Sequence, residues 1–159
     1  EGLVMIETHK GATVTPISAS EIEEIFDLRA TLECNLLEQS MGSLSPEDIN
    51  AAEDILNQLD RAIYDNQDRA AIGALNEAFH DKLYRGAALG LTADIVRTLN
   101  KKAQRYVRIH ITHAGGYKTA QAEHRELLGL VKLGDKKGAV EFLKKHLEAA
   151  KIGLLKLTQ

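Results

Sequence analysis

Histidine is the residue type whose spacing in this sequence points most directly to chemistry. His124 precedes Leu127 and Leu128 by three and four residues, and His146 follows Phe142 by four. This spacing places each ring on the apolar face of a helix. His80 lies at the edge of a third apolar stripe. We therefore expect three helices each to point one imidazole toward the protein interior.

Asn76 has a side-chain amide and lies one helical turn before His80. Asn76 precedes His80 by four residues, so the two side chains lie on neighbouring turns and can point at a common atom. Neutral imidazoles bind zinc, nickel, copper or iron, and an amide oxygen can complete the set of ligands. The pattern fits a metal site, although a single histidine on an apolar face is more often a core residue bonded to a carbonyl or hydroxyl oxygen.

Arg29 occupies the centre of the apolar stripe on the first predicted helix, between Ile25 and Leu32. A buried guanidinium needs an acidic partner. That partner is either Glu33, one turn later, or the carboxylate of a bound ligand, which arginine holds in a forked geometry.

Two further signals are weaker. Residues 95–122 contain six basic residues and no acidic residue before Glu123, a pattern typical of a solvated helix face and alternatively of nucleic-acid contact. His110 falls on the apolar side of the same helix and is a weaker candidate for the metal site. His80 and Asp81 form the dipeptide found in one class of metal-dependent phosphohydrolases. No phosphate-binding loop, dinucleotide-binding turn or Ser-His-Asp spacing occurs, so catalysis has little support.

The elements that must position these residues are predicted to be helices. The 159 residues contain 4% aromatic residues and no Trp, which leaves Leu, Ile, Val and Ala to form the core. Capping and turn signals divide residues 17–159 into six helices in an antiparallel, all-α bundle. The second of these helices is predicted to run to about Tyr64, and the fourth to begin at about Thr92. Residues 1–16 alternate apolar and polar residues around a His-Lys-Gly turn and end at Pro16, as a β-hairpin does.

Composition and charge set the remaining expectations. No apolar run is long enough to span a membrane, and the single cysteine, Cys34, excludes an intrachain disulfide, so we expect a cytoplasmic protein. Residues 17–94 carry 16 acidic and 5 basic residues, whereas residues 95–159 carry 5 acidic and 14 basic residues. Either acidic and basic helices face each other, or the C-terminal half contributes to an anion site.

The order of these motifs resembles a known family. The segments DLRATLE, NEAFH and AEHRELLGLVKLGDKKGA, followed by His146, resemble the C-terminal ligand-binding domain of GntR-family transcription regulators of the FadR subfamily (FCD). The resemblance covers about residues 17–157, and six helices indicate the shorter, VanR-like branch. GLVMIETHKGATV resembles the β-wing that ends the winged helix-turn-helix domain of this family.

The resemblance implies a helical bundle with a central cavity that binds a divalent metal and a small carboxylate or sugar-acid effector. Carried over residue by residue, the metal ligands are His80, His124 and His146, with Asn76 at the position of the family's aspartate. Zinc is the first choice, with nickel, manganese or iron as alternatives. Arg29 matches the arginine of the family's R-x-x-L-E segment and is the expected ligand-binding residue. A neutral amide binds a dication more weakly than a carboxylate does, so Asn76 is a departure from the pattern.

We therefore predict two parts. Residues 1–16 are the β-wing remnant of an N-terminal winged helix-turn-helix domain with its linker, and residues 17–159 are the effector-binding and dimerisation domain. The predicted function is effector sensing by a homodimeric transcription regulator, and we do not expect an enzyme. The regulator is expected to bind operator DNA through a preceding domain and not to bind a membrane. The alternative is a metal-dependent hydrolase or isomerase that uses the same histidines.

Overall fold

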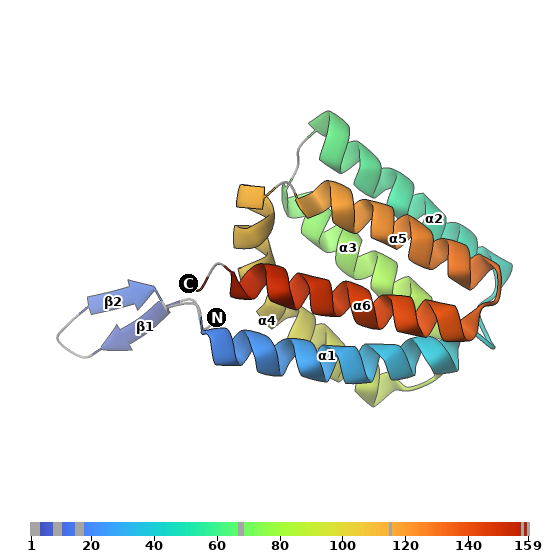
Figure 1. The fold of residues 1–159 in the computed structure, drawn as a ribbon, viewed down its shortest axis with the longest axis horizontal. Coiled ribbons are helices and arrows are strands. Elements are labelled where there is room, and N and C mark those ends of the chain that lie inside the picture. Colours follow the sequence, from blue (N-terminus) through green and yellow to red (C-terminus); the bar gives the residue numbers. More distant parts are fainter. Residues whose placement is uncertain are drawn as a thin grey trace.

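The computed structural model describes residues 4–7, 11–14, 18–66, 69–114, 116–156 and 158. Over these residues the chain forms an antiparallel bundle of six α-helices, preceded by a two-stranded hairpin (Figure 1). The helices are α1 (Ala19–Ser40), α2 (Pro46–Arg61), α3 (Arg69–Tyr84), α4 (Gly90–Ala114), α5 (Gly116–Lys132) and α6 (Lys136–Leu155). The predicted all-α bundle is confirmed.

The hairpin consists of β1 (Val4–Glu7) and β2 (Gly11–Val14), which pair antiparallel. Val4 lies opposite Val14, and Glu7 lies opposite Gly11. The predicted turn includes His9 and Lys10, which lie outside the described residues, as does Pro16. The hairpin's assignment as a β-wing remnant stays a prediction.

Local signals in the sequence set most helix boundaries. Ser18 caps α1 by accepting a hydrogen bond from the backbone N–H of Glu21. Ser45 and Asp48 form a reciprocal capping box at the start of α2, with Pro46 in the first turn. Asp135 caps α6 directly after Gly134, whose φ of +70° suits a residue without a side chain.

Two boundaries differ from the predicted ones. The predicted second helix runs to about residue 64, but α2 ends at Arg61 and continues as a π-helical turn, Ala62–Asn66. The fourth helix begins at Gly90, before the predicted start at Thr92. Neither difference moves a predicted site residue to another element.

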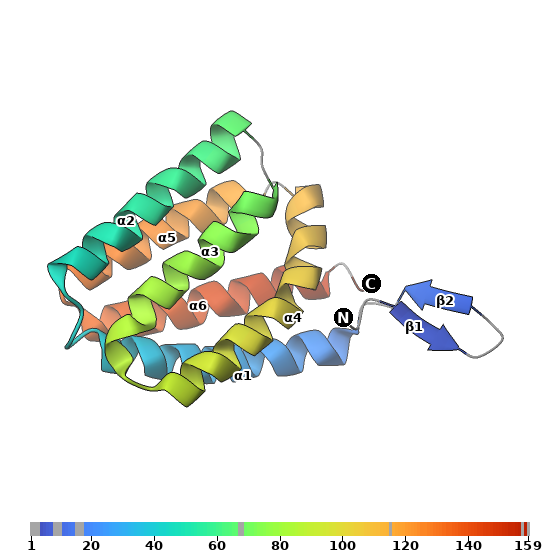
Figure 2. The same cartoon turned by 180° about the vertical axis from the view of Figure 1, so that it is seen from behind.

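The helices pack in two groups. Helices α2, α3 and α5 lie together, α1 pairs with α6, and α4 crosses α1 (Figures 1 and 2). The α5–α6 contact joins the groups. As a result, the middle parts of α1, α3, α5 and α6 all approach the interior of the bundle.

Ion pairs connect the acidic and basic halves of the chain. Lys132 Nζ lies 2.6 Å from Glu53 Oε1, Arg125 pairs with Asp60, and Lys151 Nζ lies 2.8 Å from Asp27 Oδ1. Opposite charges on facing helices therefore account for part of the charge asymmetry, as the simpler interpretation predicted.

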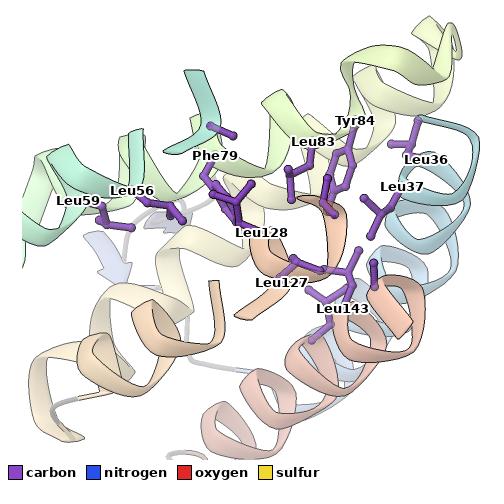
Figure 3. Close-up of a cluster of buried hydrophobic side chains, with 14 of the residues drawn as sticks. Leu36, Leu37, Leu56, Leu59, Phe79, Leu83, Tyr84, Leu127, Leu128 and Leu143 are labelled. Atoms are coloured by element: carbon purple, nitrogen blue, oxygen red, sulfur yellow. The ribbon is translucent and has the colours of Figure 1, made fainter. Parts of the chain in front are cut away.

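Two clusters of buried apolar side chains form the core. In the larger cluster, Phe79 and Leu83 of α3 pack against leucines from α1, α2, α5 and α6. Figure 3 shows part of this cluster. The smaller cluster joins α1, α4 and the end of α6; its buried members are Ile22, Ile25, Phe26, Ala103, Tyr106 and Leu154. Within the described part of the chain, no helix is long and apolar enough to cross a bilayer.

Candidate metal and ligand cavity

A cavity of about 330 Å³ lies between the two core clusters. Its wall includes Phe26 and Leu154 from the smaller cluster and Leu59 and Leu147 from the larger one. The polar part of the wall includes all five residues that the sequence predicts for the site: Arg29, Asn76, His80, His124 and His146. The fold thus brings together, in one cavity, side chains from α1, α3, α5 and α6.

The three histidine rings lie in mutual contact. The ring centroids of His80 and His124 are 5.1 Å apart, those of His124 and His146 are 5.0 Å apart, and those of His80 and His146 are 5.8 Å apart. One ligand nitrogen from each ring lies within 4.8 Å of the other two. Three imidazoles from three helices can therefore converge on a single ion.

The Nδ1 atom of each ring lies close to a side-chain oxygen atom. His146 Nδ1 lies 2.6 Å from Glu123 Oε2, and because a carboxylate only accepts, the ring donates. His124 Nδ1 lies 3.5 Å from Gln121 Oε1. The amide nitrogen of Gln121 donates to Leu56 O and Asp60 Oδ1, which directs its oxygen toward His124.

His80 Nδ1 lies 3.3 Å from the hydroxyl of Tyr84, one turn later on α3. That hydroxyl donates to Glu33 Oε2 at 2.7 Å, so His80 is in turn connected to a carboxylate on α1. A metal-binding histidine usually donates its second ring nitrogen to such an oxygen, which fixes its tautomer and orientation. Each of the three histidines therefore has an oxygen atom near Nδ1, an arrangement that suits Nε2 as the metal ligand.

Burial keeps two of the rings neutral. The removal of His80 from water lowers its pKa well below the usual value, and the adjacent His124 and His146 add to this shift. Burial likewise lowers the pKa of His124, with a further contribution from His146. A neutral imidazole is the form that binds a metal.

The donor set fits a divalent transition metal. His124 Nε2 is buried and has no hydrogen-bond partner among the described residues, a costly state that a metal ion would relieve. Asn76 lines the same cavity one turn before His80, where its amide oxygen can join the three nitrogens. Three imidazoles with one oxygen ligand match zinc or a similar first-row ion.

Arg29 contacts Glu33, its predicted partner within the chain, and also lies on the wall of the cavity. Its Nε donates to Glu33 Oε1 at 2.7 Å, so the intrachain partner is present. Its guanidinium lies over the Phe26 ring, 4.7 Å from the centroid, and the side chain also lines the cavity. No hydrogen bond occupies its two terminal nitrogens within the described part of the chain, and they remain available to a ligand carboxylate.

The described residues behind the two weaker predictions do not join the three histidines. Asp81 is not a member of the metal-binding cluster found among the described residues, so the phosphohydrolase interpretation gains no support. Lys101 and Lys102 of α4 are exposed and Arg97 pairs with Asp94, as expected for a solvated face. The side chains of Arg105, Arg108 and His110 lie outside the described residues.

Several residues of the site were not predicted. Gln121 and Glu123 precede His124 by three residues and by one, but which side chain bonds to which ring depends on the packing of α5 against α6 and α2. Asn100 of α4 lines the cavity and its Oδ1 is buried without a partner in the described structure. Glu33 was predicted as a partner of Arg29, whereas its contact with Tyr84 was not.

The sequence and the helical bundle are similar to those of known proteins. The FCD domain family model matches residues 24–149. The HTH-type transcriptional regulator YdhC of Bacillus subtilis (strain 168) is 24% identical over 148 residues, which are 92% of this chain and 65% of that protein. The chain thus spans slightly less than two thirds of this relative.

Solved structures show the same fold. A GntR-family transcriptional regulator from Pseudomonas syringae pv. tomato str. DC3000 is 29% identical, with a TM-score of 0.79 over 98% of this chain and 64% of that one. McbR/YncC of E. coli has a TM-score of 0.83 at 18% identity, over 99% of this chain and 78% of that one. The predicted resemblance to GntR-family regulators is confirmed, and the chain belongs to the FCD domain family.

Proposed function

We propose that the cavity is the effector-sensing site of a bacterial transcription regulator, in which a divalent metal and a small carboxylate or sugar acid bind side by side. The observation that carries the proposal is that one ring nitrogen from each of three histidines converges in the same cavity that a buried arginine lines. The FCD family match and the regulator relatives support it.

The proposed metal ligands are Asn76, His80, His124 and His146. When bound, the ion supplies positive charge and open coordination positions. Because all four ligands are neutral, they leave its full charge in place, and this charge favours an anion in the cavity. Zinc is our first choice, with nickel, manganese or iron as alternatives.

The rest of the cavity defines the class of effector. A volume of about 330 Å³ is at the small end of the range for small-molecule sites. Arg29 can hold a carboxylate in a forked geometry. The buried Oδ1 of Asn100 has no hydrogen-bond donor among the described residues, and a hydroxyl group on the effector would supply one. A hydroxylated organic or sugar acid meets both requirements.

We further propose that the whole protein is a homodimer that binds operator DNA through a winged helix-turn-helix domain preceding the hairpin. Regulators of this type read two half-sites with two-fold symmetry. An effector that binds one arrangement of the two subunits better than another would shift the population toward it and so alter DNA binding.

A thermal-shift screen of organic and sugar acids, with and without zinc, tests the proposal. A true effector should raise the melting temperature of the wild-type chain only when metal is present. Arg29→Gln should abolish the acid's effect while it keeps an N–H donor for Glu33. Arg97→Gln, the control on the outer face of α4, should respond like the wild type.

A chain that zinc does not stabilise, or an acid that stabilises Arg29→Gln as well as the wild type, would contradict the proposal. Chemical conversion of an acid in the same screen would instead favour the alternative of a metal-dependent hydrolase or isomerase.

A further inference from the structure

A buried chain of hydrogen bonds runs behind the cavity wall and links the arginine to the first histidine. Arg29 Nε donates to Glu33 Oε1, Tyr84 donates to Glu33 Oε2, and His80 Nδ1 contacts the Tyr84 hydroxyl, at 2.7, 2.7 and 3.3 Å. Glu33 is fully buried, and Tyr84 is 5% exposed. Neither Glu33 nor Tyr84 lines the cavity.

The direction of each hydrogen bond in this chain follows from the chemistry of its ends. Arg29 is always a donor, and the Glu33 carboxylate accepts at both oxygens. A phenol keeps its proton at neutral pH, and because the Glu33 carboxylate can only accept, the Tyr84 hydroxyl donates that proton to Glu33. With that proton directed to Glu33, the Tyr84 oxygen can only accept from His80.

We propose that Glu33, acting through Tyr84, is a positioning residue that holds His80 with its hydrogen on Nδ1 and its lone pair on Nε2. This tautomer presents Nε2 to the group formed with His124 and His146. The proposal rests on the proposed function only where it assigns Nε2 to the metal, because the tautomer itself is a property of the metal-free chain.

The variant Glu33→Gln should reverse the chain of hydrogen bonds. Arg29 Nε still requires an acceptor, so the amide oxygen of the glutamine faces Arg29 and its NH2 group faces Tyr84. The Tyr84 oxygen then accepts from the amide, and its proton turns to His80 Nδ1. His80 must carry its hydrogen on Nε2, which blocks the metal ligand.

The variant Tyr84→Phe removes the hydroxyl without reversing the direction of the remaining hydrogen bonds. His80 loses the oxygen that fixes its tautomer, and we expect metal affinity to fall about 10- to 100-fold, as for other residues that support metal ligands. In the double variant no hydroxyl remains to force hydrogen onto Nε2. The double variant should therefore bind metal more tightly than Glu33→Gln alone, a rescue that a merely structural role would not produce.

The matched control is Tyr106→Phe. Tyr106 is also a buried tyrosine, at 2% exposure, and its hydroxyl donates to Glu21, but it belongs to the smaller core cluster and does not line the cavity. Its loss should leave the His80 tautomer and the metal affinity unchanged.

The experiment has two readouts. Long-range ¹H–¹⁵N correlation spectra of the chelator-treated chain, with the His80 signals assigned by their loss in His80→Gln, report the tautomer. Zinc titration against a competing chelator reports the affinity. We expect hydrogen on Nδ1 of His80 in the wild type and on Nε2 in Glu33→Gln, with the rescue described above.

Hydrogen on Nε2 of His80 in the wild type would overturn the proposal, as would unchanged zinc affinity in both Tyr84→Phe and Glu33→Gln. If Glu33→Gln fails to fold, Tyr84→Phe and the wild-type spectrum still decide. A wild-type chain that has the Nδ1–H tautomer but binds no zinc would support the proposed tautomer control and contradict the proposed metal site.

Discussion

At the scale of single residues, the site depends on histidines that are held neutral by burial. The pKa of His80 and of His124 lies well below 6.5 in the folded chain, whereas in the unfolded chain each returns to about 6.5. Below this pH the unfolded chain therefore binds more protons than the folded chain. The same burial that prepares the rings for a metal makes the metal-free fold sensitive to acid.

We expect the metal-free chain to keep its stability above about pH 6.5 and to lose it as the pH falls below that value. The loss should reach about 1.4 kcal/mol per pH unit for each of the two groups, until the pH passes their folded pKa values. Urea unfolding of the chelator-treated chain at several pH values between 7.5 and 5 measures it. His124→Leu should show a shallower dependence. A stability that is equal at pH 7.5 and 5.5 would show that the rings are not buried as described.

Asn76 offers a second test at this scale. Asn76→Asp adds a carboxylate at the proposed ligand position, and we expect zinc affinity to rise about tenfold or more because the new ligand carries charge. Competition with a coloured chelator measures the change. Asn100→Asp is the matched control, since it places the same charge on the wall of the same cavity. Equal tightening by both variants would indicate a field effect and remove Asn76 from the ligand set.

Sequence reasoning predicted which residues share the cavity, but not which atoms hold them. The intervals around His124 and His146 define a helix face, and a face is enough to predict burial. The contact between His146 and Glu123 depends on the rotation of α6 against α5, and that between Tyr84 and Glu33 depends on how α3 meets α1. Such cross-helix contacts have no periodicity within either segment, so the sequence alone does not reveal them.

At the scale of elements, the metal would connect three helices. His80 lies on α3, His124 on α5 and His146 on α6, and α5 packs on α6. Helix boundaries followed from caps at Ser18, Ser45 and Asp135, which are local signals. The π-helical turn after α2 has no such signal, because the sequence around Ala62 continues an ordinary helical pattern.

Zinc should therefore protect these three helices together against local opening. At a free zinc concentration 100 times its dissociation constant, the folded state gains about 2.7 kcal/mol. Hydrogen exchange should show slower opening in α3, α5 and α6, with a smaller change in the first turns of α2, which lie away from the cavity. Protection confined to a single helix would contradict a shared ion. His146→Ala should remove the zinc effect from all three helices.

At the scale of the whole molecule, we expect a homodimer. The start of α4 exposes Leu91 and Ile95, at 77% and 43%, one helical turn apart. Neighbouring exposed apolar residues of this kind suit an interface with a second copy. Sedimentation velocity at micromolar concentration should show a dimer, and Leu91→Glu should weaken it. Lys101→Glu is the control for the change of charge on the same helix. A wild-type chain that stays monomeric would contradict the prediction.

We propose that one metal ion binds among His80, His124 and His146. The most direct test is the zinc content of the chain after equilibrium dialysis at neutral pH, measured by atomic emission. We expect one zinc ion per wild-type chain and almost none in folded His124→Ala and His146→Ala. Alanine variants that keep the full zinc content, or a folded wild-type chain that retains no metal, would contradict it.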